Sequence, residues 1–423
     1  MAAMLQRRAA AGLWRAALVQ QLPSTSSFSS SAAATAAEPS PSFNGPTESR
    51  PQSFYARDIQ YELATPQPRV NLEDLKFGTC FTDHMFLAEH TAEAGWGQPA
   101  IKPFGFIPLH PAAQVLHYGM CCFEGMKAYQ GVDGRARLFR PDMNMARFHR
   151  SSQRLQLAEF DPQELLECIK ELLRVDRAWL PAKEGYSIYI RPFMFSSAHV
   201  LGVAKTTRSM VSVVLSPVGP YFPTGLRPIS LFVDELHRRA WPGGVGDVKV
   251  GGNYAPTIQP QVEAAAAFGT QQVLYTLNPT HTPFSEEAVF AECGAMNMFF
   301  LLEQRGGGRE LVTPRLDGTI LPGVTRDSIL QLARGWGEFE VSERQLTLRE
   351  VKEAAKEGRL LECFGAGTAC IVQPVGVLLR ANGDVMTAQY QAGDLRSVAL
   401  RAQRQLLDIQ YGRQPHPWSV AIE

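Results

Sequence analysis

The order of strand-like and helix-like patterns along the chain is the feature that most restricts its fold. Strand patterns at residues 187–195, 210–216 and 229–233 follow one another directly, with no helical pattern between them. Regular βαβ repeats would place a helix after every strand. The sequence therefore predicts an α+β protein rather than a doubly wound parallel sheet.

A Gly- and Pro-rich stretch at residues 219–225 divides the chain near its middle. Such stretches are typical of the loops between folded units. We therefore expect an N-terminal α+β domain at 68–222 and a C-terminal domain at 237–423, joined by an interdomain segment at 223–236. Residues 38–67 are rich in Pro, Ser and Gly, which predicts a flexible linker ahead of the first domain.

Short motifs predict where individual elements begin and turn. Asp133-Gly134 lies between two strand patterns and is a strong signal for a β-hairpin. Asp161, followed by Pro162 and Glu164, has the pattern of an N-cap, a first-turn proline and a capping-box acid. The helix that they open has an apolar face made of Leu165, Leu166, Ile169, Leu172 and Leu173. Further predicted elements are strands at 272–277, 298–303 and 338–342, helices after Gly323, after a capping box at Thr347 and Glu350, and at 394–409, and a hairpin at Asn382-Gly383.

The first 37 residues have the composition of an organellar targeting sequence. Arg7, Arg8 and Arg15 all occur before the first acidic residue, Glu38, and Ser, Ala and Thr are abundant. Basic, Ser-rich and acid-poor segments are typical of transit peptides, and Arg15 interrupts the apolar core that a secretory signal needs. We therefore expect residues 1–37 to be a transit peptide for the mitochondrial matrix, because the early arginines favour the mitochondrion over a plastid.

Charge and cysteine content narrow the class of protein. Lys plus Arg equals Asp plus Glu at 41 each, so the basic excess of a nucleic-acid or membrane-surface protein is missing. The longest apolar run, at 210–215, is too short to cross a bilayer. The seven cysteines include no C-x-x-C pair, and Cys and His do not cluster at zinc spacing. We expect an enzyme with a small-molecule substrate and no metal, nucleic-acid or membrane partner.

The densest special sequence is the segment 241–257, W-P-G-G-V-G-D-V-K-V-G-G-N-Y-A-P-T, in which five glycines surround Lys249. A Walker loop would need Ser or Thr after the lysine, but Val250 follows. The dinucleotide fingerprint also fails, because its last glycine would fall on Lys249. A lysine in a partly dry setting has a lowered pKa and attacks carbonyl carbons, as a Schiff-base lysine must. On its own, however, a lysine among glycines is more typical of a surface turn.

The lysine segment resembles that of the branched-chain aminotransferases, which are fold-type IV pyridoxal-phosphate enzymes. The resemblance runs from about Phe77 to Tyr411. Its motifs are F-G-T-C-F-T-D-H-M (77–85), G-W-G-Q-P (95–99), L-H-Y-G (116–119), F-E-G-M-K-A-Y (123–129), L-F-R-P-D-M-N-M-A-R (138–147), Y-I-R-P (189–192), L-G-V (201–203), Y-F-P (221–223), E-C-G-A-M-N (292–297), L-P-G-V-T-R (321–326) and F-G-A-G-T-A-C (364–370). The presequence and segments such as 95–99 point to the mitochondrial type. The resemblance implies the two-domain α+β architecture of fold type IV, pyridoxal 5'-phosphate bound by the C-terminal domain, and reversible amino transfer from L-leucine, L-isoleucine or L-valine to 2-oxoglutarate.

The resemblance also assigns cofactor-binding roles to single residues. Lys249 would form the Schiff base and move the proton between the substrate Cα and C4′ of the cofactor. Tyr254 would hydrogen-bond the phenolic oxygen, and Glu292 would pair with the pyridine nitrogen. The residues around the phosphate would be Arg147, Val324, Thr325 and Thr368.

By the same resemblance, a single pocket would accept both branched aliphatic side chains and the distal carboxylate of glutamate. Its residues would be Phe77, Tyr118, Tyr189, Arg191, Val203, Tyr221, Gly367 and Ala369. Tyr189 and Arg191 are two apart on a predicted strand and therefore share a face. The loop 201–203 of one subunit would reach the site of its neighbour, so a homodimer is implied.

Two positions depart from the family pattern. Mammalian relatives carry C-x-x-C where this chain has Cys370 and Gln373, so we expect no intramolecular redox switch at this place. Ala295 stands where relatives often have threonine, which removes one hydroxyl near the cofactor.

Some alternatives stay open at the level of sequence. The segment 279–291 is longer than usual, so Glu286 and Glu287 remain rivals of Glu292 for the pyridine nitrogen. A lyase or a D-amino-acid transferase would share the fold type, and activity on D-alanine or aminodeoxychorismate instead of L-leucine would reveal it. A non-catalytic binding partner or scaffold is the third possibility, and the presence of both Lys249 and Glu292 argues against it.

Overall fold

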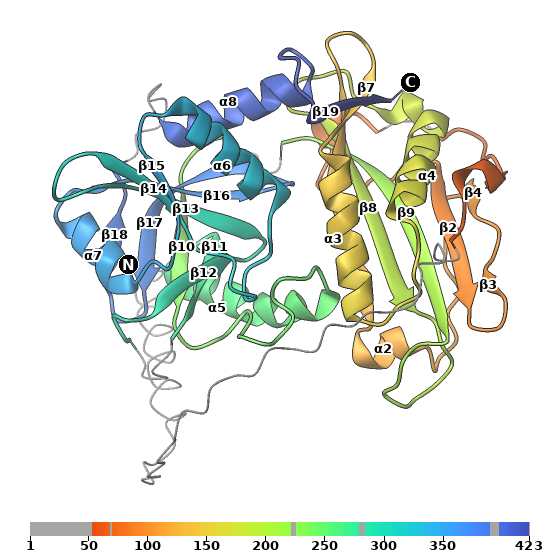
Figure 1. The fold of residues 1–423 in the computed structure, drawn as a ribbon, viewed down its shortest axis with the longest axis horizontal. Coiled ribbons are helices and arrows are strands. Elements are labelled where there is room, and N and C mark those ends of the chain that lie inside the picture. Colours follow the sequence, from red (N-terminus) through yellow and green to blue (C-terminus); the bar gives the residue numbers. More distant parts are fainter. Residues whose placement is uncertain (1–52, 68–69, 221–225, 279–283, 390–396, 423) are drawn as a thin grey trace, which may run out of the picture.

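The computed structural model describes residues 53–67, 70–220, 226–278, 284–389 and 397–422. These residues form two large sheets that lie side by side, each with its own helices (Figure 1). The strands and helices do not follow regular βαβ repeats, so the predicted α+β class is confirmed.

The first sheet has ten strands in the order β1-β4-β2-β9-β8-β6-β7-β19, with β3 paired to β2 and β5 paired to β8. Their bounds are β1 Gln60–Tyr61, β2 His84–Thr91, β3 Gly95–Trp96, β4 Ala100–Pro103, β5 Cys121–Phe123, β6 Met126–Gln130, β7 Ala136–Phe139, β8 Ser187–Ser196, β9 Arg208–Val218 and β19 Ser419–Ile422. Alternate apolar residues of β8 and β9 pack with helices α3 (Pro141–Arg154) and α4 (Pro162–Val175) in one buried core. A short helix, α2 (Gln114–Tyr118), precedes β5.

The second sheet has nine strands in the order β12-β11-β10-β17-β16-β13-β14-β15, with β18 paired to β17. Their bounds are β10 Ile229–Asp234, β11 Gln272–Leu277, β12 Val289–Cys293, β13 Met296–Glu303, β14 Arg309–Thr313, β15 Glu340–Glu343, β16 Leu360–Gly367, β17 Ile371–Arg380 and β18 Val385–Thr387. An additional pairing of β12 with β13 closes six of these strands into a ring. Apolar residues fill the ring, among them Phe290, Met298 and Val375.

Four helices belong to the second half of the chain: α5 (Ile258–Phe268), α6 (Val324–Trp336), α7 (Leu348–Lys356) and α8 (Val398–Gln410). Helices α6 and α8 cover one side of the sheet in a separate core that also takes in Tyr129 and Phe139 of the first sheet. Short 3-10 turns are found at η1 Ala56–Asp58, η2 Leu72–Asp74, η3 Arg177–Trp179, η4 Gly251–Asn253 and η5 Ala255–Thr257.

The predicted α4 is confirmed, but its capping box is only half correct. Asp161 accepts a hydrogen bond from the Gln163 N–H at 2.8 Å, as an N-cap should. The capping-box acid does not reach back to Asp161, because the Asp161 N–H donates to Ser53 Oγ at 2.9 Å. Glu164 instead accepts the Ala56 N–H at 2.9 Å and ties the N-terminal segment to the helix.

The other local predictions are met closely. Asp133-Gly134 turns between the paired strands β6 and β7, and Asn382-Gly383 turns between β17 and β18. Thr347 caps α7 by accepting the Glu350 N–H at 3.2 Å. The helix expected at 394–409 is α8, which is capped by Ser397, whereas 390–396 lie outside the described residues.

The structure corrects the extent of the predicted linker 38–67. Residues 1–52, which include the expected transit peptide 1–37, lie outside the described residues. Residues 53–67 pack on the first sheet, however: Phe54 is only 2% exposed in its core, and β1 pairs with β4. Two apolar side chains, Phe54 and Ile59, anchor a segment whose overall composition is that of a loop.

The sheets also divide the chain differently from the expected domains. β10 lies inside the segment 223–236 that was expected to join the domains, yet it pairs with β11 and β17 in the second sheet. β19 follows the whole C-terminal half but pairs with β7 in the first sheet (Figure 1). The end of the chain therefore returns to the half of the molecule in which the described residues begin.

Candidate active site

The glycine-rich segment around Lys249 crosses between the two halves of the molecule and is not a surface turn. The Lys249 N–H donates to Ser151 Oγ of α3 at 2.9 Å, and its carbonyl accepts the Phe123 N–H at 3.0 Å. A Cβ at Gly251 would lie 2.7 Å from Cys121 Sγ, so only glycine lets the segment pass this close to β5. The backbone on both sides of the lysine is thereby fixed.

The Lys249 amine lies among aromatic side chains. Its Nζ is 3.0 Å from the Tyr254 hydroxyl and 4.8 Å from the centre of the Phe123 ring. The side chain is half-buried and extends into the pocket that Tyr254 also lines. An amine held in this way is accessible to a ligand in the pocket, but only partly accessible to bulk water.

Glu292 is a buried carboxylate on β12 that faces the same pocket. One oxygen accepts hydrogen bonds from Asn297 Nδ2 at 2.8 Å and from the Leu321 N–H at 3.2 Å. The other lies 2.5 Å from Arg239 Nη1. Burial raises the pKa of the Glu292 carboxyl, and the charges of Arg239 and Lys249 oppose that rise.

Arg147 projects from α3 and is held by a second buried carboxylate, Glu124. Its Nε and Nη2 donate to the two Glu124 oxygens at 2.8 and 2.6 Å, and Nη1 donates to the Pro322 carbonyl at 3.0 Å. An arginine has five N–H donors, so two remain for a ligand. The pair also ties the first half of the chain to the loop that precedes α6.

The N-terminus of α6 opens onto the pocket beside Arg147. Gly323 is its N-cap and has no side chain that could satisfy the first amides of the helix. A Cβ at Gly323 would lie 2.1 Å from Asn297 Oδ1, so this approach also requires glycine. Uncapped amides at the positive end of a helix dipole form a binding site for anions.

Most of the residues assigned by resemblance line one pocket. They are Arg147, Tyr189, Lys249, Tyr254, Glu292, Val324, Thr325, Gly367, Thr368 and Ala369. They come from both sheets and from the segments between them. Residues that are far apart in the sequence therefore meet between the two halves of the molecule.

The remaining substrate-pocket predictions fall into two groups. Phe77 packs edge-on against the Tyr189 ring, with a centroid distance of 4.8 Å, and Arg191 donates to the Tyr189 hydroxyl at 3.2 Å. Tyr118 and Val203 lie away from the pocket: the Tyr118 hydroxyl donates to the carbonyl of Leu201, and Val203 is 81% exposed. Tyr221 lies outside the described residues.

Three residues of the site were not predicted as such: Arg239, Asn297 and Glu124. Asn297 pairs with Glu292 across the tight β12–β13 hairpin around Gly294, whose φ is 53°. Its position inside the motif E-C-G-A-M-N could have revealed it. Arg239 and Glu124 left no comparable signal, because their burial and pairing depend on segments that are distant in sequence.

The structure weakens the sequence-level rivals of Glu292. Glu286 pairs with Lys352 and Arg380, and Glu287 pairs with Arg349 on the surface. Neither glutamate lines the pocket, whereas Ala295 does. Cys370 contacts Met296 Sδ at 3.5 Å, while Gln373 is buried and donates to the Arg227 carbonyl at 2.8 Å.

Two general properties can be stated for the part of the chain that the structure describes. No group of three or more side chains there is arranged to hold a metal ion. No helix there is both long enough and apolar enough to cross a membrane.

The comparisons with known proteins agree with this geometry. Residues 121–375 match the family described as amino-transferase class IV. The branched-chain-amino-acid aminotransferase of Monosiga brevicollis is 46% identical over 378 residues, which are 89% of this chain and 95% of that protein. The mitochondrial branched-chain-amino-acid aminotransferase of Rattus norvegicus is 45% identical over 373 residues, 88% of this chain and 92% of the relative. Further relatives are named as cytosolic enzymes.

A solved structure extends the similarity to the fold. A bacterial branched-chain amino acid aminotransferase, solved with pyridoxamine 5'-phosphate, is 28% identical, with a TM-score of 0.62, and the match covers 81% of this chain and 100% of that one. The fold and the matched residues define a class IV aminotransferase, as the fold-type IV prediction required. Within that class, the chain belongs to the family of the branched-chain-amino-acid aminotransferases.

Proposed function

We propose that this enzyme moves the amino group reversibly between L-leucine, L-isoleucine or L-valine and 2-oxoglutarate, with pyridoxal 5'-phosphate as its cofactor and Lys249 as its catalytic residue. One observation carries the proposal. An amine, a buried carboxylate and an uncapped helix N-terminus line the same pocket, contributed by Lys249, Glu292 and α6. An aldehyde, a pyridine nitrogen and a phosphate would each find a chemical complement there.

The residues present fit this cofactor in charge as well as in type. Glu292 Oε2 and Arg239 Nη1 are buried and lie close together, but neither makes a well-directed hydrogen bond. The carboxylate therefore keeps an acceptor for a protonated ring nitrogen. Arg147, the amides of Val324 and Thr325, and Thr368 would hold the phosphate. When bound, the cofactor supplies an electron sink for the bond pair released at the substrate Cα.

The chain itself supplies proton transfer and orientation. Lys249 Nζ would bond to the cofactor in the absence of substrate, and after displacement it would remove the proton from the substrate Cα and return one to C4′. Tyr254, 3.0 Å from Nζ, would donate to the phenolic oxygen and keep the amine directed into the pocket. Glu292 would keep the ring nitrogen protonated.

Spectroscopy and a substrate panel test this proposal. The purified enzyme should show the absorption band of the lysine-bound cofactor and should convert L-leucine with 2-oxoglutarate, but not D-alanine or aminodeoxychorismate. Lys249→Ala should lose the band and reduce turnover by several orders of magnitude, while its circular dichroism spectrum stays unchanged. Normal turnover of L-leucine by Lys249→Ala would overturn the assignment.

For the substrate pocket, we propose that Phe77, Tyr189, Arg191, Gly367 and Ala369 act from the same subunit. Tyr118 and Val203 lie away from this pocket and flank an exposed apolar loop that contains Leu201 and Val203. This arrangement supports a homodimer in which the loop completes the neighbour's pocket. Light scattering should give twice the chain mass, and Val203→Asp should yield monomers with a raised KM. A fully active monomer would contradict the dimer.

We also propose that residues 1–37 direct the protein to the mitochondrial matrix, because they are basic, rich in Ser and free of acids. Fusing residues 1–37 to a fluorescent protein tests the address. A diffuse cytosolic or a plastid signal would contradict it.

A further inference from the structure

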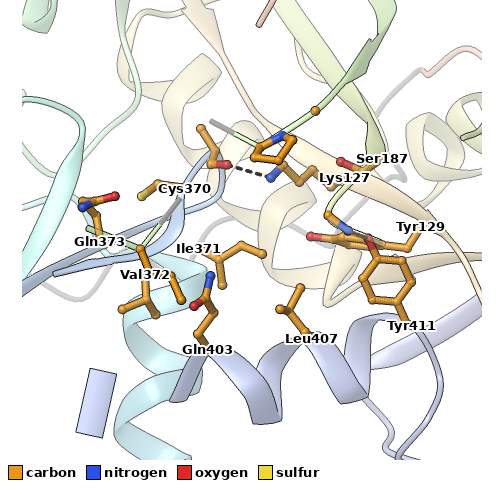
Figure 2. Close-up of a pocket in the computed structure, with 15 residues that line it drawn as sticks. Lys127, Tyr129, Ser187, Cys370, Ile371, Val372, Gln373, Gln403, Leu407 and Tyr411 are labelled. Atoms are coloured by element: carbon orange, nitrogen blue, oxygen red, sulfur yellow. Dashed lines mark hydrogen bonds between the residues drawn. The ribbon is translucent and has the colours of Figure 1, made fainter. Parts of the chain in front are cut away.

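A cavity of about 110 Å³ lies behind the turn that connects β16 to β17 (Figure 2). Gly367, Thr368 and Ala369 of this turn wall the candidate cofactor pocket. Ala369 and the next residue, Cys370, also line the cavity on the other side. This short turn is thus the partition between the pocket and the cavity.

Lys127 of β6 crosses the cavity from the first sheet to this turn. Its Nζ donates a hydrogen bond of 2.7 Å to the carbonyl of Ala369, as the dashed line in Figure 2 marks. The side chain is buried, with 7% of the residue exposed. Among the residues that the structure describes, no carboxylate forms an ion pair with it, so the amine is committed to a peptide carbonyl.

The turn needs such support because its backbone is in an unfavourable conformation. Ile371, which pairs with Gly367 where the turn begins and ends, has a φ of 63°. A β-branched residue rarely adopts this left-handed region, so surrounding contacts must impose it. The contact from Lys127 comes from the opposite half of the molecule and fixes one carbonyl of the turn.

We propose that Lys127 is a positioning residue for substrate binding: by holding the Ala369 carbonyl, its ammonium group fixes the turn that walls the cofactor pocket. The inference rests on the proposed function and adds a residue to it. In a trans peptide, the C=O and N–H point in opposite directions. Drawing the Ala369 carbonyl into the cavity therefore directs the N–H of Cys370 away from the cavity, and the positive charge polarises the same peptide. A substrate carboxylate in the pocket meets a turn with one fixed orientation.

The charge of Lys127 should change in an accessible pH range. Burial lowers the pKa of its amine to about 8. The other titratable side chains that line the cavity are Tyr129, Cys370 and Tyr411. Burial raises the pKa of all three, well above its usual value for Tyr129, to about 11 for Cys370 and to about 12 for Tyr411. Between pH 7 and 10, Lys127 is thus the one described group in this cavity that changes charge, and its hold on the carbonyl weakens as the pH rises through 8.

Equilibrium binding of 4-methylvalerate, a branched carboxylate that cannot donate an amino group, tests the inference on the cofactor-loaded enzyme. At pH 7, Lys127→Met should bind it about tenfold more weakly than the wild type, because a charged hydrogen bond is lost. At pH 9.5 the two should bind equally. Lys127→Arg, which stays charged, should bind at least as tightly as the wild type at pH 9.5. The KM for L-leucine should follow these changes, while kcat stays within about twofold.

The matched control is Gln403→Met, which changes the same cavity from α8 without contacting the Ala369 carbonyl. It should leave binding and its pH profile unaltered. Equal binding by Lys127→Met and the wild type at pH 7 would overturn the inference. So would a weakening that is the same at every pH and that Lys127→Arg does not restore, because that pattern marks a purely structural role. Failure of the proposed function looks different: the wild type itself would then neither transaminate L-leucine nor bind 4-methylvalerate.

Discussion

Two buried ion pairs hold the charged groups of the pocket in place. Glu292 lies beside Arg239, and Glu124 binds Arg147 through both of its oxygens. Each pair contains one residue that the motifs identified and one that they did not. A motif marks the group that meets the ligand, whereas its partner is found only when the fold brings a distant segment next to it.

Removing the charge of Arg239 should destabilise the protein in a pH-dependent manner. In Arg239→Leu, the buried Glu292 loses the cation that opposes the rise of its pKa. A carboxyl whose pKa is raised by folding contributes stability that is present below its unfolded pKa and is lost as the pH rises through its folded pKa. The free energy of unfolding should therefore fall by about 1–3 kcal/mol more at pH 8 than at pH 5.

Urea denaturation of the apoenzyme at both pH values measures this difference. Arg239→Lys is the matched control, since it keeps the charge and should show a smaller pH effect. Cofactor affinity should fall at least tenfold in Arg239→Leu, because a protonated Glu292 no longer attracts the ring nitrogen. A loss of stability that is equal at pH 5 and pH 8 would contradict the proposed coupling.

At the scale of elements, the site depends on the β12–β13 hairpin and the beginning of α6 packing closely. Asn297 on the hairpin binds both Glu292 and the Leu321 carbonyl, and Gly323 passes directly beside its side chain. The pyridine-binding and phosphate-binding parts of the pocket are therefore mechanically connected.

A methyl group at Gly323 should disrupt both parts at once. In Gly323→Ala, the new Cβ would lie 2.1 Å from Asn297 Oδ1, so the asparagine must move and release Glu292. Cofactor affinity should fall more than tenfold, and stability should fall by about 1–3 kcal/mol. Titration of the apoenzyme with pyridoxal 5'-phosphate measures the affinity.

Gly335→Ala is the control on the same helix. No atom outside the helix backbone lies within 4 Å of a Cβ there, so alanine should raise stability by up to about 1 kcal/mol through its helix propensity, with unchanged cofactor affinity. If both variants bound the cofactor normally, the close approach at Gly323 would have no functional importance.

How well the sequence predicts each element depends on how local its determinants are. Helix α4 could be predicted completely, because its cap and its apolar face are written within about 14 consecutive residues. Lys249 was identifiable only through resemblance, since glycines around a lysine have several local meanings. The pairing of β19 with β7 could not be predicted, because it joins residues about 280 positions apart whose local patterns say nothing about each other.

At the scale of the whole molecule, the N-terminal segment contributes to the core of the first half. Phe54 packs against Phe86, Trp96 and Phe160. We expect Phe54→Ala to lower the free energy of unfolding by about 3 kcal/mol, because a large aromatic side chain leaves a cavity.

A truncated protein that lacks residues 1–52 serves as the reference for this experiment and should be as stable as the full chain. Extending the deletion through Ile59 should match or exceed the effect of Phe54→Ala. Denaturant midpoints compare the three proteins. If the longer deletion were as stable as the shorter one, Phe54 and Ile59 would not anchor this segment.

The closed ring of strands has a consequence for how quickly the enzyme can be made. Its closure joins β10 to β17, for example Leu231 to Leu378, across most of the C-terminal half of the chain. Contacts this distant in sequence make folding slow, since long loops must close before any of them forms. Glu292 lies on β12, one of the strands that complete the ring, so cofactor binding can begin only after this late step. A newly synthesised chain therefore passes through a period in which its strands are exposed to other chains and the cofactor cannot yet protect it.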